Sequence, residues 1–376
     1  VDMTTGAFTD SLTAVSITGD SVLSFDLNYN SLNSGESGQL GYGWSHGFET
    51  YLDVKANNIN VHWTPTNYTT FLSENNVIRK VDGTIVDNEI IIHTTNDTGA
   101  KNYMPINSNV GNYKLSRDDD GMYTLTSPEG IKNIFDESGK LVQIIAANGK
   151  TTNLEHIGNS TIISDPITNV KITLNYNDAG LITSVKDSAG RSAVIAYNNG
   201  LITKVTNALG QTVCYEYDEN NRLIKATVDG EKSSYVTNKY DENGRVIEQD
   251  DGDASTPLTY FTYKEENGKL TVTATDRNNV YDEKTKTNSH EVTFVSDGLG
   301  HVISFTDQNK NTTYYSYDTK GNLIFETDAL GNKISYTYDK NNWLASMKDA
   351  GGNVTKMTYD SKGNILSLEG PDGVKN

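Results

Sequence analysis

The sequence predicts an all-β protein in which antiparallel hairpins, repeated along the chain, build a curved, spiralling sheet. Short segments of alternating apolar and polar residues recur between turns rich in Asp, Asn and Gly, a pattern typical of half-buried strands. A Tyr-Asp pair opens near-identical segments at Tyr317, Tyr338 and Tyr359, which are 21 residues apart. A fixed period of this length is the signature of a repeat architecture. No segment has a compelling helical pattern.

Composition limits the classes of function. The chain has 376 residues and a formal net charge of −18, from 49 acidic and 31 basic residues. Nucleic acids and anionic membranes are bound by clustered Lys and Arg, so this balance argues against both. Cys214 is the single cysteine, which excludes an intrachain disulfide and a thiolate metal cluster. No apolar run approaches the roughly 18 residues of a membrane-spanning helix.

The ends of the chain are also informative. The first residues, VDMTTGAFTDSLTAVSI, contain neither the basic nor the apolar region of a signal peptide. The last residues, PDGVKN, stop within a unit that resembles the preceding repeats. We therefore expect the chain to be a segment of a longer polypeptide.

Three regions are predicted in order. Residues 1–52 form an N-terminal β module, because residues 23–29 alternate in polarity and residues 41–48 interleave glycines with aromatic side chains. Glycines of this kind let a strand bend and let the backbone approach other groups closely. Residues 53–122 are predicted as irregular β structure that continues into the curved sheet. Residues 123–376 are predicted as the repeat region.

The repeat region contains about ten copies of one unit. An aromatic residue begins each copy, a turn follows it, and a second turn separates two strands. The loop at 276–291 lengthens one copy. The aromatic positions are Phe135, Tyr176, Tyr197, Tyr217, Tyr240, Tyr263, Phe294, Tyr317, Tyr338 and Tyr359.

The chemistry of the turns explains the recurring spacing within each copy. Asp at the first position accepts hydrogen bonds from backbone amides, and Gly at the fourth adopts a conformation that bulkier residues resist. Asn221 and Asn342 replace this glycine, and Asn tolerates the left-handed region. The residues to which we assign a structural role in the repeat are Tyr217, Asp218, Tyr240, Asp241, Gly244, Tyr317, Asp318, Gly321, Asp328, Gly331, Tyr338, Asp339, Tyr359, Asp360 and Gly363.

Stacking of neighbouring hairpins is required, because an isolated hairpin is marginal in water. Each repeat adds about two strands to a long antiparallel strip, and such a strip must curl to manage its twist and its edges. We expect the tyrosines to stack in a ladder from one repeat to the next.

These residues resemble the YD repeats of the Rhs family. The units follow YDxxGxLxxxxDxxGN, and the segments VDMTTGAFTDSLTAVSI and LGYGWSHGFETYL are similar to the module that precedes such repeats in bacterial Rhs and wall-associated proteins. Toxin-complex shell subunits and teneurins are relatives. The resemblance implies a hollow β shell, which in the bacterial toxins encloses a cytotoxic C-terminal domain. A core motif of the YYDPxxGRF type is absent from these residues.

The residues that could form a catalytic or metal site are better explained by structural roles. The histidines are scattered without metal-ligand spacing, and the acidic runs at 118–120 and 248–253 do not match a calcium loop. Nucleophile elbows, P-loops and dinucleotide motifs are absent. We therefore predict no catalytic residue, no metal and no cofactor. Trp44 and Trp63 are candidate ligand-facing aromatics. The histidines are His46, His62, His93, His156, His290 and His301.

Two functional hypotheses follow. The first is a non-enzymatic shell segment of a larger secreted or cell-surface bacterial protein, which encloses or presents its own C-terminal domain. The alternative is an extracellular module that binds carbohydrate or a cell-surface ligand, using exposed aromatic residues or the 276–291 loop. An enzyme is the least favoured class.

Overall fold

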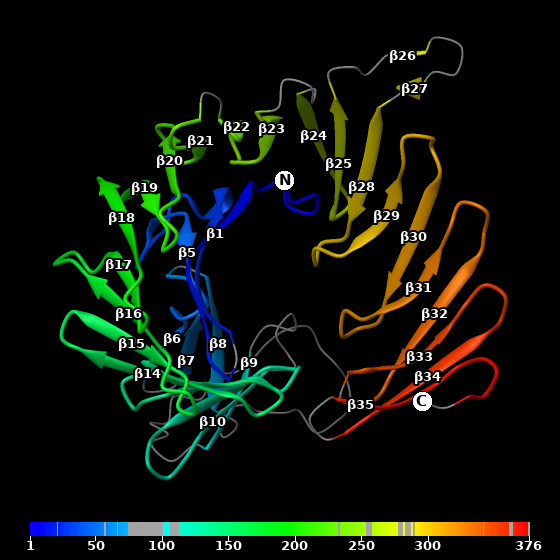
Figure 1. Cartoon of the computed structure of the whole chain (residues 1–376). Helices are drawn as coiled ribbons and strands as arrows, with labels where there is room; N and C mark the ends of the chain where they lie inside the picture. The colour runs from blue at the N-terminus through cyan, green and yellow to red at the C-terminus, as the bar shows by residue number, and fades with distance from the viewer. Residues whose placement is uncertain are drawn as a thin grey trace.

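The protein is organised around one long antiparallel sheet that curls round on itself (Figure 1). This is the arrangement in a computed structural model, which describes residues 1–20, 22–55, 58–65, 67–73, 101–105, 113–231, 234–252, 258–276, 281–282, 287–288, 290–340, 342–360 and 364–374. Within these residues there is no α-helix, and consequently none that could cross a membrane. The predicted all-β, spiralling antiparallel class is confirmed.

Over the described residues the sheet has 28 strands and is not closed. Its edge strands are β6, which pairs only with β7, and β35, which pairs only with β34. Neighbours along the chain pair in order, except that β25 pairs with β28. The first strands are β6 (Tyr51–Val54), β7 (Asn58–His62), β8 (Tyr68–Ser73), β9 (Asn102–Pro105), β10 (Lys114–Arg117), β11 (Tyr123–Thr126), β12 (Lys132–Phe135), β13 (Leu141–Ile145), β14 (Thr151–Ile157) and β15 (Ser160–Ser164).

The sheet continues through the repeats. The next strands are β16 (Lys171–Tyr176), β17 (Ile182–Asp187), β18 (Ser192–Asn198), β19 (Leu201–Thr206), β20 (Thr212–Tyr217), β21 (Leu223–Val228), β22 (Val236–Tyr240), β23 (Val246–Asp250), β24 (Thr259–Glu266) and β25 (Lys269–Asp276). The last are β28 (Glu291–Ser296), β29 (Val302–Thr306), β30 (Thr312–Tyr317), β31 (Leu323–Thr327), β32 (Lys333–Tyr338), β33 (Leu344–Lys348), β34 (Val354–Tyr359) and β35 (Ile365–Glu369). Between β25 and β28, β26 (Tyr281–Asp282) pairs with β27 (Thr287–Asn288), and the rest of the predicted 276–291 loop lies largely outside the described residues.

A small N-terminal module lies inside the curve of this sheet (Figure 1). Its three-stranded sheet consists of β1 (Thr9–Thr18), β2 (Val22–Asn30) and β5 (Trp44–Ser45). A 3-10 turn, η1 (Ser31–Asn33), and the short pair β3 (Ser37–Gly38) and β4 (Gly41–Tyr42) complete it. Strand β2 alternates between buried and more exposed residues, as the alternation in residues 23–29 predicts.

The hydrophobic core lies between the module and the inner face of the sheet. Leu27 and Phe25 of β2 are fully buried, and so are Ile172 and Val185 of the facing strands. Because the side-chain period of a strand is two, one face of the repeat strands up to β25 enters this core and the other faces away from it. Each Å² of apolar surface removed from water stabilises the folded state by about 25 cal/mol. The apolar surface buried between the module and the sheet therefore stabilises the fold.

Many of the repeats turn at an Asp and bulge at the aromatic residue before it, as at Tyr217, Tyr240, Tyr317, Tyr338 and Tyr359. The Asp318 carbonyl accepts from the Gly321 amide (3.1 Å), and its carboxylate accepts from the amides of Lys320 (2.8 Å) and Asn322 (2.9 Å). Gly321 has a φ of +84°, a region that L-residues with side chains resist. The strand register shifts between Ser316 and Tyr317. Asp218, Asp241, Asp328 and Asp339 bond their turns in the same way.

The tyrosines connect successive repeats by hydrogen bonds rather than by ring stacking. Six of the repeat tyrosine hydroxyls donate to a backbone carbonyl of the preceding repeat, 15 or 17 residues earlier. A side chain four residues after the turn Asp covers several of the rings. Among the described residues, no ring contact joins two successive repeat tyrosines. The expected ladder of stacked tyrosine rings is therefore wrong, because the tyrosines join the repeats through their hydroxyl groups. The bonds run from Tyr197 to Ile182 (2.7 Å), Tyr240 to Leu223 (2.6 Å), Tyr263 to Val246 (2.5 Å), Tyr317 to Val302 (2.9 Å), Tyr338 to Leu323 (2.9 Å) and Tyr359 to Leu344 (2.8 Å).

Candidate functional site at the inner face and rim of the sheet

The N-terminal module binds the backbone of the repeats at equivalent positions. At three of the bulges, the residue that pairs with the repeat tyrosine donates its amide to an acceptor of the module. These contacts fix the module on the inner face of the sheet through main-chain chemistry, which does not depend on the side chain of the donor. The three bonds run from Ile182 N to Gln39 O (2.8 Å), from Leu223 N to the Tyr29 hydroxyl (2.8 Å) and from Val246 N to Gly6 O (2.9 Å).

Glycines allow the closest approaches between the module region and the turns. The Leu52 amide donates to the Gly139 carbonyl (2.8 Å), and a Cβ at Gly139 would lie 2.1 Å from the Leu52 oxygen. A Cβ at Gly41 would lie 2.0 Å from the Gly200 oxygen. No carbon atom fits at these distances, so both glycines are required by the approach of another backbone as well as by their own positive φ.

Trp44 belongs to this interface. Its exposed fraction is 2%, its indole nitrogen donates to the Tyr217 hydroxyl (2.9 Å), and its ring meets Tyr215 edge-on at 5.1 Å. The structure therefore places Trp44 in the core between module and repeats, not on a ligand-facing surface, because its indole joins the two layers. Trp63 is partly buried, donates to Thr69 (3.1 Å) and contacts the ring of Tyr113 at 5.1 Å.

The inner face is covered along only part of the sheet. Ile182, Leu223 and Val246, which pair with repeat tyrosines, are fully buried beneath the module. Ile365 holds the same register position opposite Tyr359 and is 62% exposed. The other equivalents in the last eight strands, Val302, Leu323 and Leu344, are only partly buried. We call the inner-facing residues of β28–β35 the open inner face.

The open inner face carries large apolar and aromatic side chains. Glu326, which pairs with Tyr315 and Ile334, is a charged member of this face. The apolar and aromatic members are Val292, Phe294, Val302, Phe305, Tyr315, Tyr317, Leu323, Ile334, Tyr336, Tyr338, Leu344, Met347, Met357, Tyr359, Ile365 and Leu368. All of these are partly or largely exposed. Exposed apolar side chains gathered on one face of a sheet are typical of interaction sites.

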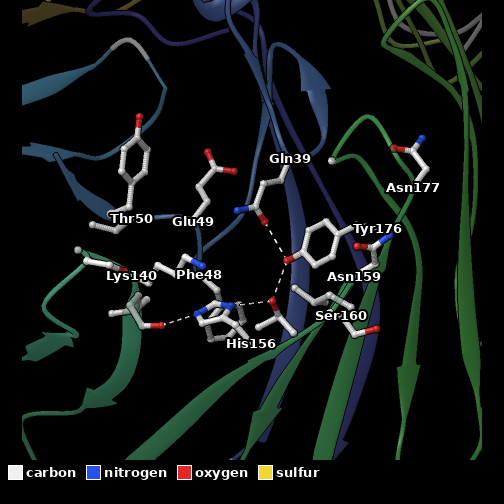
Figure 2. A pocket seen from close by; sticks show the side chains of 18 of the residues that line it. Gln39, Phe48, Glu49, Thr50, Lys140, His156, Asn159, Ser160, Tyr176 and Asn177 are labelled. Carbon is white, nitrogen blue, oxygen red and sulfur yellow. Dashed lines mark hydrogen bonds between the residues drawn. The ribbon is translucent and has the colours of Figure 1, made fainter.

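A second feature is a cleft of about 720 Å³ at the rim where the module meets β12–β17. Gln39 and Phe48 reach it from the module, Lys140 from the β12–β13 turn, and His156 and Tyr176 from the repeats (Figure 2). Its volume is within the range of about 300–1,000 Å³ typical of small-molecule sites. Hydroxyls, amides and aromatic rings form most of its wall, which we call the rim cleft.

A chain of hydrogen bonds crosses the rim cleft (Figure 2). His156 Nε2 lies 2.9 Å from the Leu141 carbonyl, and Nδ1 lies 3.0 Å from the Thr161 hydroxyl. A carbonyl only accepts, so Nε2 carries the proton and Thr161 donates to Nδ1 of the neutral ring. The Tyr176 hydroxyl is 3.1 Å from both Thr161 Oγ1 and Gln39 Oε1, and donates to one of them.

Glu49 and His46 lie buried behind the cleft. Burial raises the pKa of Glu49 to about 7 and lowers the pKa of His46 to about 3. Between those values both groups are neutral, so their 3.6 Å contact is not an ion pair in that range. His46 Nδ1 accepts from the Phe48 amide (3.2 Å), which leaves Nε2 to donate to Gln39 Oε1 (3.1 Å). Both carboxylate oxygens of Glu49 are buried without a hydrogen-bond partner.

The other residues singled out from the sequence make local contacts within the sheet and its turns. His301 bonds Asp297 (3.0 Å) and stacks on Tyr317 at 4.7 Å. Asp118 accepts from the amides of Asp120 and Met122 within its own turn. Among the described residues there is no group of three His, Cys, Asp or Glu side chains placed to hold a metal. His93 and Gly363 lie outside the described residues.

Sequence reasoning missed the rim cleft, although one signal was present. His156 precedes Tyr176 by 20 residues, which is one repeat length, and it bonds the carbonyl 15 residues earlier as the repeat tyrosines do. It therefore occupies a tyrosine position. Gln39 and Glu49 carried no such signal, because only the tertiary fold brings them to β16.

Models of known families match three parts of the chain. A domain of unknown function (DUF6531) matches residues 1–71, the teneurin YD-shell matches residues 124–233, and the RHS repeat matches residues 317–354 and 338–375. These matches to the RHS repeat and the teneurin YD-shell are consistent with the Rhs/YD-repeat family. The Rhs/YD-repeat assignment agrees with the repeat geometry described above and with the resemblance noted from the sequence.

The chain spans less than a quarter of the length of the toxin and toxin-complex proteins that it matches. Double-stranded DNA deaminase toxin A of Burkholderia cenocepacia is 29% identical over 123 residues, which are 29% of this chain and 8% of the toxin. The Photorhabdus luminescens Tc holotoxin pore has a TM-score of 0.39 at 11% identity, over 96% of this chain and 22% of that one. The TcdB2–TccC3 structure has a TM-score of 0.33 at 12% identity, over 96% and 22%. The chain is thus similar to a shell-like repeat segment and, over 123 residues, to part of a toxin.

Proposed function

We propose that this chain is a non-catalytic wall segment of a longer secreted or cell-surface protein, and that its open inner face contacts another part of that polypeptide. The open inner face carries this proposal. Positions that are fully buried under the module in one part of the sheet are exposed in the other, although strand pairing and register are the same. The N-terminal module therefore covers the first part of the sheet, while the equivalent face of β28–β35 is left open to another contact.

The chemistry of the cover follows from the module. The module presents apolar side chains of β2, such as Phe25 and Leu27, to the inner face. The open inner face offers similar apolar and aromatic groups, with few charges, so its natural contact is an apolar surface of a folded or folding chain. The Rhs/YD-repeat similarity supports a C-terminal domain as that contact, and the toxin relative supports a toxic one.

Thiol labelling tests the proposal. Cys214 is replaced by Ser, and Leu344→Cys is introduced on the open inner face, with the exposed, outward Thr337→Cys as its matched control in the neighbouring strand. Labelling rates are compared between residues 1–376 alone and the natural full-length polypeptide. We expect Leu344→Cys to react at least tenfold more slowly in the full-length polypeptide, while Thr337→Cys is unchanged. Equal rates for Leu344→Cys in both would contradict enclosure.

A further inference from the structure

A second cleft lies where the first strands of the curled sheet meet the last repeats. Its volume is about 530 Å³, which is within the range of about 300–1,000 Å³ typical of small-molecule sites. One side is formed by β10–β13 and the turns between them, and the other by the turns that join β30 to β31 and β32 to β33. A ligand bound there would contact two parts of the sheet that are far apart in the sequence.

Four lysines line this cleft, which we call the lysine cleft. Glu129 is the single carboxylate among its described lining residues, and it accepts from the hydroxyl of Ser127 (2.7 Å). The cleft is therefore positive, although the chain as a whole has a formal net charge of −18. The lysines are Lys114, Lys132, Lys320 and Lys340.

Strand register places two of these lysines on one face of the sheet. Lys114 and Lys132 both pair with Thr126, one from each side. Tyr123 and Leu125 of the same strand are buried in the core, so alternation directs Thr126 and its two partners away from the core. Neighbouring strands are about 4.8 Å apart, and the two lysines therefore leave the sheet roughly 10 Å from each other. One ligand can meet both if it carries more than one anionic group.

The protein leaves these charges uncompensated. Many lysines elsewhere on the sheet have an acidic partner, as Lys204 has in Asp229 (3.0 Å). Within the residues that the structure describes, the four lysines of the cleft have neither an ion pair nor a side-chain hydrogen bond. Asp318, close to Lys320 in its turn, accepts instead from the turn amides. Like charges in one cleft repel one another, and a bound anion would offset that repulsion.

The chemistry of the wall favours a compact polyanion. Lysine ammonium groups bind phosphate as point charges, and lysines on both sides of the cleft suit several phosphate groups in one ligand. Trp343 and Pro128 add apolar surface. A long polyanion such as a nucleic acid would also meet the acidic remainder of the surface, which repels it. We propose that the lysine cleft binds a small ligand with two or more phosphate groups, an inorganic or a nucleoside polyphosphate, which bridges the first strands and the last repeats.

This inference does not rest on the wall function, and its test uses the whole chain of residues 1–376. Sodium tripolyphosphate and ATP are titrated by isothermal titration calorimetry without divalent cations, with hexaglutamate as an acidic-peptide probe. We expect saturable binding of tripolyphosphate, weakened at least tenfold between about 20 and 200 mM salt by screening. Tighter binding of ATP would identify a nucleoside polyphosphate, and weaker binding of ATP an inorganic one. No saturable binding of either phosphate compound, or tighter binding of hexaglutamate, would overturn the proposal.

Two double variants test whether the ligand bridges the cleft. Lys114→Gln with Lys132→Gln removes the charges of the first strands, and Lys320→Gln with Lys340→Gln removes those of the last repeats. All four side chains are exposed, so these changes leave the core intact. Each double variant is expected to weaken tripolyphosphate binding tenfold or more, because the ligand contacts both sides. Undiminished binding in either of them would contradict a bridging site.

A third double variant controls for net charge. Lys171→Gln with Lys186→Gln removes the same charge from two exposed lysines of the neighbouring strands β16 and β17, outside the lysine cleft. Its affinity for tripolyphosphate is expected to stay within twofold of that of the unmodified chain. A loss as large as in the cleft variants would mean that the anion responds only to the overall charge, and the site would be refuted.

Discussion

The hydroxyl of Tyr338 donates a 2.9 Å hydrogen bond to the carbonyl oxygen of Leu323, one repeat earlier. Leu323 itself pairs with Tyr317 across the bulge of its own repeat. A tyrosine thus connects its own hairpin to the bulge of the preceding one, and the same bond recurs along the sheet. Cohesion between repeats therefore rests on a side chain-to-backbone bond as well as on the strand ladder.

Removing this hydroxyl should weaken the sheet without creating a cavity. Tyr338→Phe is expected to lower the free energy of unfolding by about 0.5–1.5 kcal/mol, the usual net worth of one hydrogen bond. Tyr314→Phe is the matched control, because Tyr314 is on the outer face and 58% exposed. Urea unfolding measures both. Equal stability of the two variants would show that the bond to Leu323 contributes nothing.

The turn glycines differ in what surrounds them. A Cβ added at Gly331, which has a φ of +85°, would meet no atom within 4 Å, whereas one added at Gly139, with a φ of +86°, would meet the Leu52 oxygen. Gly331→Val should cost about 1–3 kcal/mol from backbone strain alone. Gly139→Val should cost more, because it also displaces β6. Thermal unfolding of the pair tests this order, and an unchanged midpoint for Gly331→Val would refute the turn assignment.

Glu49 makes stability depend on pH. Burial raises its pKa to about 7 in the folded chain, above the value of about 4.3 in an unfolded one. The folded state therefore holds the proton more tightly between these values, and stability is lost as pH rises from about 4.3 to 7. The groups nearest to Glu49 are Glu36, which raises its pKa further, and His46.

Removal of the carboxylate gives the corresponding prediction. Glu49→Gln should abolish this part of the pH dependence and should raise the free energy of unfolding at pH 8 by up to about 3 kcal/mol. Urea unfolding from pH 4.5 to 8 measures the effect, with the exposed turn residue Glu219→Gln as control. A variant with the same pH profile as the unmodified chain would rule out a buried, protonated Glu49.

The covered and open parts of the inner face offer a register-matched comparison. Val185 pairs with Leu174 and is fully buried, while Met347 pairs with Tyr336 in the same way and is partly exposed. Val185→Asp should cost more than about 3 kcal/mol, since it buries an unpaired charge. Met347→Asp should cost less than about 1 kcal/mol in the isolated chain. Similar losses in urea unfolding would mean that the open inner face is covered after all.

Local chemistry made much of the fold predictable. A turn such as Asp318 to Gly321 is specified by the acceptor at one end and the left-handed residue at the other, and period-two strands such as residues 333–338 follow from their own pattern. The 21-residue spacing then indicated stacked hairpins and the family. These features depend on neighbours in the chain, so residues close in sequence were sufficient.

Contacts between residues far apart in the chain could not be predicted from the sequence. Trp44 was expected to face a ligand. The residues near it in the sequence do not show that its indole nitrogen donates a hydrogen bond to Tyr217, which is 173 residues away. The rim cleft joins Gln39 to Tyr176 across 137 residues for the same reason. The sequence by itself determined the hairpin, its turn and its repetition, since these depend on backbone geometry within a few residues. Only the tertiary structure decided which inner faces the module covers and where polar residues meet, because burial depends on what the curl of the sheet brings together.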